Sequence, residues 1–259
     1  MKKTKLILMI IFILVGKSLF AQYAHFLESG SIEFEKRVNM YALIEKGITQ
    51  NSSGIIVQAF EAYKKAQPQF LTLNSTLTFS KDKSLYIPAA NGNNNLAVNF
   101  FGNRPASSQI NTVANDLTLK TSTIQKQVYE ETFLVSDSLR KIKWKITDEM
   151  RDIAGFQCRR ANGLMMDSIY IVAFYTDMIP LSSGPESFSG LPGMILGVAL
   201  PYENVTWFAT KVTEKPVPAN NVAAPTKGKP VNNLSFQAIL SDLFKNQRSA
   251  SDLLKEYML

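Results

Sequence analysis

The sequence predicts a mainly β (α+β) fold, in which one or two helices pack on a single antiparallel, curved β-sheet. Over residues 71–79, apolar side chains alternate with threonine and asparagine, the period-two pattern of a strand with one buried face. Short apolar segments then recur about every dozen residues, a spacing typical of antiparallel sheets rather than of βαβ units. The expected strands are 71–79, 85–87, 123–135, 140–147, 155–161, 168–175, 194–200 and 205–212.

Two other segments show the spacing of an amphipathic helix. Residues 53–66 place their apolar side chains at helical intervals, and Pro68 marks the end of this helix. A second apolar stripe predicts a C-terminal amphipathic helix over residues 234–259. This C-terminal helix either packs back on the sheet or is offered to a partner.

The N-terminus has the features of a secretory signal peptide, which we assign to residues 1–21. Three lysines precede a ten-residue apolar run at 6–15, and Ala21 is a small residue of the kind found before a cleavage site. The run is shorter than the roughly 20 residues that span a bilayer; a retained N-terminal anchor is the alternative. We therefore expect an exported protein, in the periplasm, at the outer membrane or outside the cell, that does not span a membrane after signal removal.

Composition divides the rest of the chain into three parts. Residues 22–213 form a β-rich domain with a long loop of Asn, Ser and Gly at about 91–115. Residues 214–233 contain four prolines and few apolar side chains, which predicts an extended, flexible linker. Residues 234–259 contain the C-terminal helix.

The net charge of +7 does not indicate a nucleic-acid-binding protein. The chain has 28 basic and 21 acidic residues, but four lysines lie in the predicted signal peptide, which leaves 24 basic residues and a net charge of +3. The densest basic run, residues 140–145, alternates with apolar residues, as in a strand with one exposed and one buried face. No nucleic-acid partner is therefore expected.

The chain has only one cysteine and one histidine, two residue types that many enzyme active sites use. Cys158 is the only cysteine, so no intramolecular disulfide can form, and its alternation with Phe156 favours a buried side chain over a reactive thiol. His25 is the only histidine, which argues against a Ser-His-Asp triad and against metal sites built from His and Cys. We expect no catalytic residue, metal or cofactor. The alternative is a carboxylate pair drawn from Asp148, Glu149, Asp152, Asp167, Asp177 and Glu186.

The most distinctive segment is residues 179–196, with the sequence IPLSSGPESFSGLPGMIL. Its glycines and prolines predict tight turns, because glycine tolerates φ > 0 and proline fixes φ. Leu191 lies on such a turn, where either the domain's own core or a ligand or partner must bury it. The candidate binding residues are Gly184, Pro185, Gly190, Leu191, Pro192, Gly193 and Met194.

Residues 189–196, SGLPGMIL, resemble the signature of the GLPGLI family of exported bacterial proteins, with Met194 where the family name has leucine. The resemblance extends through WxI at 144–146, IAGFQCRRA at 153–161, AFYTDMIP at 173–180 and GP at 184–185. It covers about residues 140–200. The sequence DSIY at 167–170 departs from the Gly-Arg-x-Tyr pattern of many members, which indicates a subgroup. The resemblance implies an exported, β-rich protein of unassigned function and supplies no catalytic residues.

Three functions remain open. The first is a non-catalytic binding or carrier module of the cell envelope that holds an apolar ligand or a protein segment. The second is an interaction partner of an outer-membrane receptor or transporter, in contact through the Gly-Leu-Pro-Gly loop or the C-terminal helix. The third is a carboxylate-dependent hydrolase, which would need two acidic side chains together in a cleft.

Processing of the chain tests the predicted signal peptide. Mass spectrometry of the mature protein should find Gln22 at the N-terminus, in linear or cyclised form, because Ala21 precedes the expected cleavage site. A mature chain that begins at Met1 would contradict export by this route.

Overall fold

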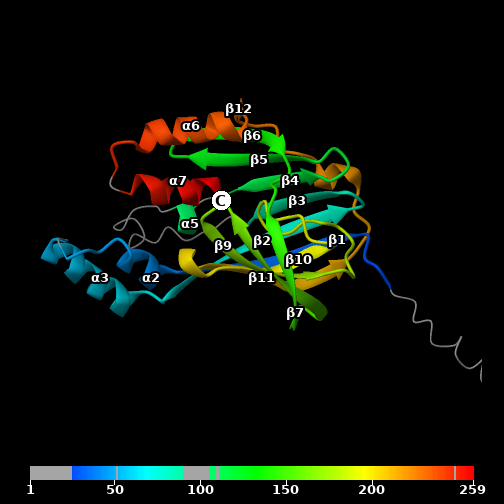
Figure 1. Cartoon of the computed structure of the whole chain (residues 1–259), viewed down its shortest axis with the longest axis horizontal. Coiled ribbons are helices and arrows are strands. Elements are labelled where there is room, and N and C mark those ends of the chain that lie inside the picture. Colours follow the sequence, from blue (N-terminus) through cyan, green and yellow to red (C-terminus); the bar gives the residue numbers. More distant parts are fainter. Residues whose placement is uncertain (1–24, 51, 90–104, 109–110, 248) are drawn as a thin grey trace, which may run out of the picture.

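Figure 1 shows the computed structural model of the chain, which describes residues 25–50, 52–89, 105–108, 111–247 and 249–259. The predicted signal peptide and most of the predicted loop at 91–115 lie outside the described residues.

Twelve β-strands form one open sheet in the order β12-β6-β5-β4-β3-β2-β1-β11-β10-β9-β8-β7. The strands are β1 (Ser29–Asn39), β2 (Phe70–Ser80), β3 (Lys83–Pro88), β4 (Thr112–Asp116), β5 (Thr121–Val128), β6 (Glu131–Ser138), β7 (Lys143–Ile153), β8 (Phe156–Met165), β9 (Ile169–Thr176), β10 (Met194–Leu200), β11 (Val205–Glu214) and β12 (Lys229–Val231). The prediction of a mainly β protein is confirmed. The sheet is mixed rather than wholly antiparallel, because the returning chain places β12 parallel to β6.

Most predicted strands are found close to their expected positions, with two corrections. The expected strand at 123–135 is a hairpin of β5 and β6, which reverses at Tyr129 (φ 52°) and Glu130. The expected loop does not extend to residue 115, because residues 112–115 belong to β4. Val113, Ala114 and Asn115 all lie buried there, so the polar composition of this segment concealed a buried strand.

Five α-helices lie among the described residues, where one or two were expected: α2 (Met40–Glu45), α3 (Gly54–Ala66), α5 (Pro105–Ser108), α6 (Asn233–Phe244) and α7 (Ala250–Met258). Helix α3 agrees with the predicted helix at 53–66. The C-terminal stripe forms two helices because the polar residues 245–249 interrupt it. Both helices pack on the protein itself: the ring of Phe236 lies 5.3 Å from that of Phe133 on β6, and the rings of Phe244 and Tyr257 stack. None of the described helices is long and apolar enough to cross a membrane.

One face of the sheet, here called the inner face, carries the core. On β1 it is formed by Ile32, Phe34 and Val38, while Glu33 and Arg37 point to the other face and are exposed. The same alternation continues on β2, β5, β6 and β11, and it arises because successive side chains of a strand point to opposite faces. A curved sheet of this size therefore needs other elements to cover its inner face.

The sheet curls strongly at the β7 end. The guanidinium of Arg151 on β7 lies 4.8 Å from the ring centre of Phe208 on β11, although three strands separate β7 from β11 in the sheet. This curl buries both faces of β9 and β10. The basic run at 140–145 keeps the expected alternation, since Ile142 and Trp144 are half-buried and the lysines on either side of them are exposed; the rest of β7, the edge strand, is largely exposed.

The Pro-rich segment between β11 and β12, here called the strap (residues 215–228), is extended but lies against the sheet. It contains a short 3₁₀ turn, η3 (Ala219–Val222), in which Val222 is buried. Figure 1 shows it running from β11 along one end of the sheet toward β12. The division of the chain at 214 and 233 stays a prediction.

Candidate functional site

The Gly-Pro-rich connection between β9 and β10, residues 177–193, is folded into the protein and covers part of the inner face. Leu181, Phe188 and Leu191 are all buried. The ring of Phe188 meets that of Trp207 on β11 edge to face, with 5.7 Å between their centres. This segment, here called the plug loop, therefore supplies core side chains to a sheet that does not close on itself.

Polar contacts fix the plug loop to strands that are far apart in the sequence. The hydroxyls of Ser183 and Ser84 on β3 lie 2.7 Å apart, and the Asn115 amide on β4 donates to Ser183 at 3.4 Å. On the other side, the indole N–H of Trp144 donates to the Ser189 carbonyl at 2.9 Å. Buried polar groups need such partners, and here they also set the position of the loop.

The glycines of the signature have the backbone angles that the sequence predicts, with φ of 95° at Gly190 and 150° at Gly193. A Cβ at Gly193 would lie 2.1 Å from the carbonyl oxygen of Thr176, so no larger residue fits there without movement of β9. A Cβ at Gly184 would come within 2.7 Å of Ile195. Gly193 is therefore required by close approach as well as by φ, whereas Gly184 is required by close approach and Gly190 is favoured by φ.

The structure places most of the candidate binding residues inside the protein. Gly184, Pro185, Leu191, Gly193 and Met194 are buried, whereas Gly190 and Pro192 are exposed. Of the two environments proposed for Leu191, the protein's own core is the one observed. A binding role for these residues stays a prediction.

Five ionisable side chains come together beside the plug loop, and we call them the inner charge cluster. They are Lys36 on β1, Lys126 on β5, Arg140 after β6, Glu186 in the plug loop and Glu256 on α7. Burial lowers the pKa of Lys36, against the charges of the two glutamates, which raise it. Charges removed from water persist only where partners compensate them.

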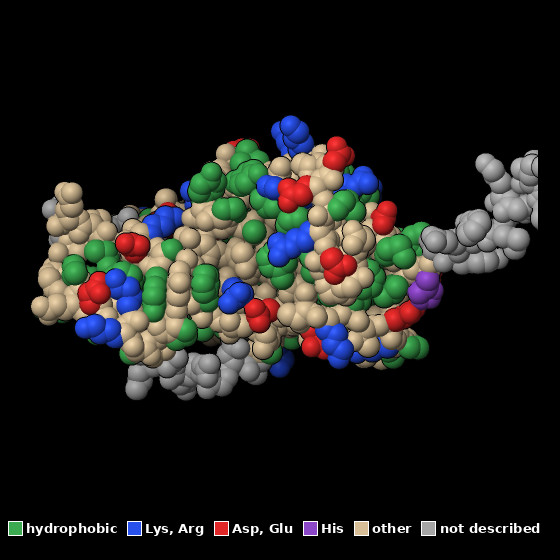
Figure 2. All heavy atoms as spheres, turned by 90° about the horizontal axis from the view of Figure 1, so that it is seen from below, with side chains coloured by type: hydrophobic (Ala, Val, Ile, Leu, Met, Phe, Trp, Pro, Cys, Tyr) green, Lys and Arg blue, Asp and Glu red, His purple; other side chains and the backbone are tan. Residues whose placement is uncertain are grey.

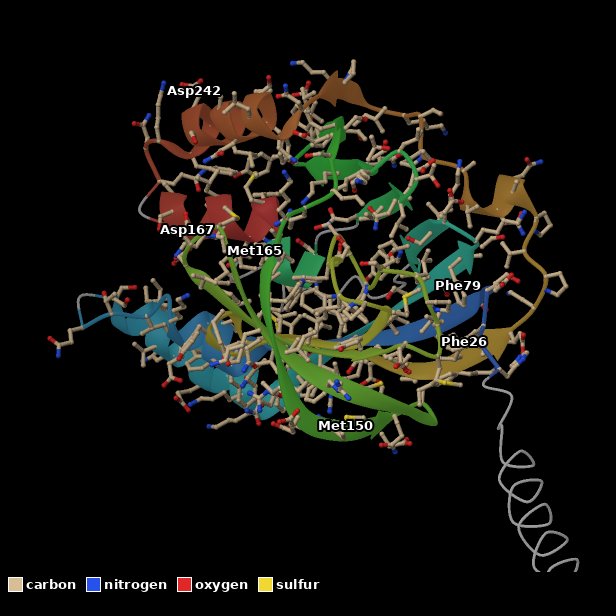
Figure 3. The ribbon with its side chains drawn as sticks, turned by 45° about the vertical axis from the view of Figure 1, so that its right-hand side comes forward. Phe26, Phe79, Met150, Met165, Asp167 and Asp242 are labelled. Carbon is tan, nitrogen blue, oxygen red and sulfur yellow. The ribbon has the colours of Figure 1, made fainter. Side chains whose placement is uncertain are left out.

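Two cations of this cluster hold the end of α7. The Lys126 ammonium donates to the Tyr257 carbonyl at 2.7 Å, and the Arg140 guanidinium donates to the Met258 carbonyl at 2.6 Å. Arg140 also lies 2.8 Å from the sulfur of Met165, which Figure 3 shows beside α7. Because the last carbonyls of a helix lack intrahelical donors, these side chains stabilise its C-terminal end.

The glutamates accept hydrogen bonds from neighbouring segments. Glu186, which has φ of 50°, accepts from the Asn111 amide at 3.0 Å, and Glu256 accepts from the Ala106 N–H at 3.3 Å. The Lys36 ammonium lies 5.1 Å from the ring centre of Trp207. The cluster thus joins β1, β5, α5, α7 and the plug loop.

Lys36, Glu186, Glu256, Asn111 and Trp207 line a cavity of about 20 Å³. The indole N–H of Trp207 and the Asn111 carbonyl oxygen are buried without a hydrogen-bond partner. A volume of this size accommodates about one water molecule, which could bond to both groups. A pair of glutamates in a cavity is what the hydrolase hypothesis required, but this cavity is too small for a substrate.

The remaining carboxylate candidates are not brought together into a site. Glu149 pairs with Arg160 at 2.5 Å, and Asp167 lies in the exposed turn between β8 and β9. Among the described residues, no group of three His, Cys, Asp or Glu side chains is placed to hold a metal ion. On the face shown in Figure 2, acidic and basic side chains are intermixed rather than gathered by sign.

Sequence reasoning missed Lys36 and Lys126, although a signal for them exists. Lys36 falls in phase with Ile32, Phe34 and Val38, and Lys126 falls in phase with its own apolar neighbours on β5. A lysine in register with the apolar side of a strand points into the core. Arg140 lies between two strands, where no pattern distinguishes it from a surface residue.

A larger recess, the strap groove, lies between the strap and the sheet and has a volume of about 590 Å³. Residues 80–83, around the β2–β3 turn, form its sheet side together with Ala114, Thr121 and Thr123. Its strap side is formed by Val217, Ala219, Val222, Ala223 and Ala224. At its wall Lys83 pairs with Asp116 at 3.0 Å. The pKa of the Asp116 carboxyl is lowered mainly by the hydrogen bond that it accepts from the Leu119 N–H, and to a smaller extent by Lys83. Sequence reasoning missed this groove because its two sides are about a hundred residues apart.

Cys158 agrees with its predicted role. It is fully buried, and burial, aided by the charge of Asp152, raises the pKa of its thiol to about 12. A thiol with such a pKa is unreactive at neutral pH.

Comparisons with known proteins identify a sequence motif and a fold. A family model described as "Protein of unknown function (Porph_ging)" matches residues 164–197, from the end of β8 through the plug loop to β10. The match contains the Gly-Leu-Pro-Gly motif, while the GLPGLI name stays a prediction. No curated protein matches the chain.

Two solved structures of a protein called PNGF-II, from crystals in space groups C2 and P21, resemble this fold. The first is 13% identical, with a TM-score of 0.51 over 82% of this chain and 32% of that one; the second is 14% identical, with a TM-score of 0.49 over 82% and 33%. This chain spans about a third of the length of PNGF-II. At this identity the likeness concerns the fold alone.

Alanine substitutions at two glycines test the packing of the plug loop. Gly193→Ala should lower the free energy of unfolding by about 2 to 4 kcal/mol more than Gly155→Ala, measured by denaturant unfolding. Both glycines have positive φ, but a Cβ at Gly155 meets nothing within 4 Å, whereas at Gly193 it meets the Thr176 carbonyl. Equal losses would show that the close approach to β9 is unimportant.

Lys126→Met tests the inner charge cluster through pH. Burial, aided by the charges of Arg140 and Lys36 and opposed by that of Glu186, lowers the pKa of Lys126 to about 7. Above that pH the unfolded chain holds a proton that the folded chain has lost, so stability should rise with pH, by at most about 1.4 kcal/mol per unit. The rise should be clearest between about pH 7 and 8, because at higher pH the thiol of Cys158 ionises in the unfolded chain, with an ordinary pKa of about 8.5, and opposes the rise.

Chemical unfolding across this range should show a smaller slope for Lys126→Met than for the unchanged chain, because the substitution removes the titrating group. Lys143→Met, at an exposed position on β7, is the control and should keep the slope. Identical slopes for all three proteins would show that Lys126 titrates normally.

Proposed function

We propose that this protein is an exported, non-catalytic binding module of the cell envelope, which holds an extended protein segment in the strap groove. The observation that carries the proposal is the volume of the groove, about 590 Å³, which lies within the usual range of about 300 to 1,000 Å³ for ligand sites. The inner cavity, at about 20 Å³, lies far below this range.

The lining of the groove suits a polypeptide backbone. The sheet side offers threonine hydroxyls, and the strap side offers small apolar groups such as Ala223 and Ala224. The Lys83–Asp116 pair leaves little net charge to select a strongly charged ligand. Small and hydroxyl-bearing side chains admit an extended chain closely and can pair with its N–H and C=O groups.

The strap favours binding in a second way. Its prolines restrict φ, so the segment loses little further conformational freedom when a ligand is held beneath it. The buried Val222 and the pairing of β12 with β6 hold both its middle and its end on the sheet. A preformed wall of this kind reduces the entropic cost of binding.

Of the ligands considered from the sequence, a protein segment is favoured over an apolar molecule. The apolar side chains of the plug loop fill the protein's own core, and the cavity beside the loop holds only about 20 Å³. The proposal remains compatible with an outer-membrane receptor or transporter as the source of the segment. Export rests on the predicted signal peptide.

Peptide selection with a blocked groove tests the proposal. Peptides selected from a random display library on the unchanged chain should bind Thr121→Trp at least about tenfold more weakly, because the indole would occupy the groove. Thr76→Trp, exposed on the outer face of β2 and away from the groove, is the matched control and should bind normally. Failure to select any peptide, or equal binding by both variants, would contradict the proposal, provided that circular dichroism shows each variant folded.

A further inference from the structure

A smaller recess, here called the signature pocket, opens beside the Gly-Leu-Pro-Gly motif and has a volume of about 140 Å³. Its lining comes from neighbouring strands and from both ends of the plug loop: Met150 on β7, Gln157 and Arg159 on β8, Tyr175 on β9, Asp177 just after it, and Pro192 before β10. The strap groove lies elsewhere, between the strap and strands β2 to β5.

Strand register brings the side chains of the signature pocket together. Arg159 pairs with Met150 on one side and with Tyr175 on the other, so these three side chains lie side by side on one face of three adjacent strands. Tyr175 also pairs with Ile195, whose side chain approaches Gly184 of the plug loop. The pocket therefore lies on the inner face, at the margin of the plug loop.

The polar side chains of this pocket are unpaired within the part of the chain that the structure describes. There, Arg159 and Asp177 form no ion pair, and neither Gln157 nor the Tyr175 hydroxyl forms a side-chain hydrogen bond. By contrast Arg160, on the other face of β8, is paired with a glutamate. Tyr175 is only 6% exposed, and a buried tyrosine normally has a partner for its hydroxyl. The unpaired groups indicate a site whose hydrogen bonds are completed by a ligand.

The charges of the pocket define the chemistry of that ligand. The guanidinium of Arg159 offers a fork of N–H donors that fits a carboxylate, and the carboxylate of Asp177 accepts from an ammonium. Because Arg159 and Asp177 do not pair with each other, a ligand that bridges them has no ion pair to break. Pro192 and Met150 add apolar surface for a short aliphatic group. The best match is a zwitterion with a small apolar part.

The size of the pocket restricts the ligand further. Its volume of about 140 Å³ equals that of about five water molecules at about 30 Å³ each, and it lies below the range of about 300 to 1,000 Å³ for larger ligands. A free α-amino acid with a short side chain, such as alanine, combines this size with both charges.

We propose that the signature pocket binds a free α-amino acid with a short side chain, with its carboxylate at Arg159 and its ammonium at Asp177. This site shares no residue with the strap groove, so the proposed function and this proposal can fail separately.

Ligands that lack one charge test the proposal. In an NMR titration, alanine should bind the unchanged chain with a Kd of about 1 mM or lower. N-acetylalanine lacks the ammonium and alaninamide lacks the carboxylate, so each should bind at least about tenfold more weakly. Equal binding of all three compounds, or no binding of glycine, alanine or serine, would overturn the proposal.

Variants assign each end of the ligand to its residue. Asp177→Asn should weaken alanine binding by about tenfold or more but leave the weaker binding of N-acetylalanine unchanged, because that compound has no ammonium to lose a partner. Arg159→Gln should weaken the binding of both compounds. A merely structural effect of Asp177→Asn would instead reduce the binding of both.

Two exposed positions away from the pocket provide matched controls. Asp167→Asn, in the turn between β8 and β9, and Arg37→Gln, on the outer face of β1, should bind alanine as the unchanged chain does. Alanine binding that survives Asp177→Asn, or that falls equally in the controls, would contradict the assignment of the site.

Discussion

An open sheet of twelve strands has an inner face that its own strands cannot cover, and the covering of that face governs the rest of this structure. The plug loop lies on it, with Leu181, Phe188 and Leu191 buried. Its position is fixed from three directions, by Ser84 on β3, by Trp144 on β7 and by the close approach of Gly193 to β9. The Gly-Leu-Pro-Gly motif is thus first a packing device, since only glycine allows the loop to come so near the strand.

The inner charge cluster extends this arrangement to the C-terminal helices. Buried ions are costly, and removing one partner leaves the others uncompensated. Lys126 and Arg140 reach the last carbonyls of α7, and Glu256 of that helix reaches α5. The packing of the plug loop on the inner face and the docking of the C-terminal helices therefore depend on the same cluster of side chains. The strap groove, one region proposed for binding, adjoins this arrangement at Asn115, which donates to Ser183 of the plug loop.

Local patterns predicted those parts of the fold that depend on local physics. Alternation identified β2, helical spacing identified α3, and turn chemistry predicted positive φ at Gly190 and Gly193. The number of helices and the mixed sheet could not be predicted, because each depends on where distant segments return. The strap, for example, reaches β6 only by passing along the whole end of the sheet.

The features of the candidate site were likewise predictable only where they depend on local sequence patterns. The sequence indicated that Leu191 must be buried but left open what buries it, since the choice between core and ligand depends on how the loop lies on distant strands. Lys36 carried a detectable signal, a lysine in phase with core residues, whereas the strap groove carried none. Composition also concealed β4, where Asn115, together with Asn111 just before the strand, donates to the plug loop instead of lying in an open loop.

Hydrogen exchange at the plug loop tests the central claim most directly. Two buried residues of the loop report on it: the Ser183 N–H donates to the Leu181 carbonyl at 2.8 Å, and the Phe188 N–H donates to the Pro185 carbonyl at 3.2 Å. If the loop is part of the core, these amides open only with the sheet and should exchange as slowly as those in the middle of β1. Exchange within about tenfold of an unprotected loop would show that the plug loop opens by itself, and that the inner face is covered in some other way.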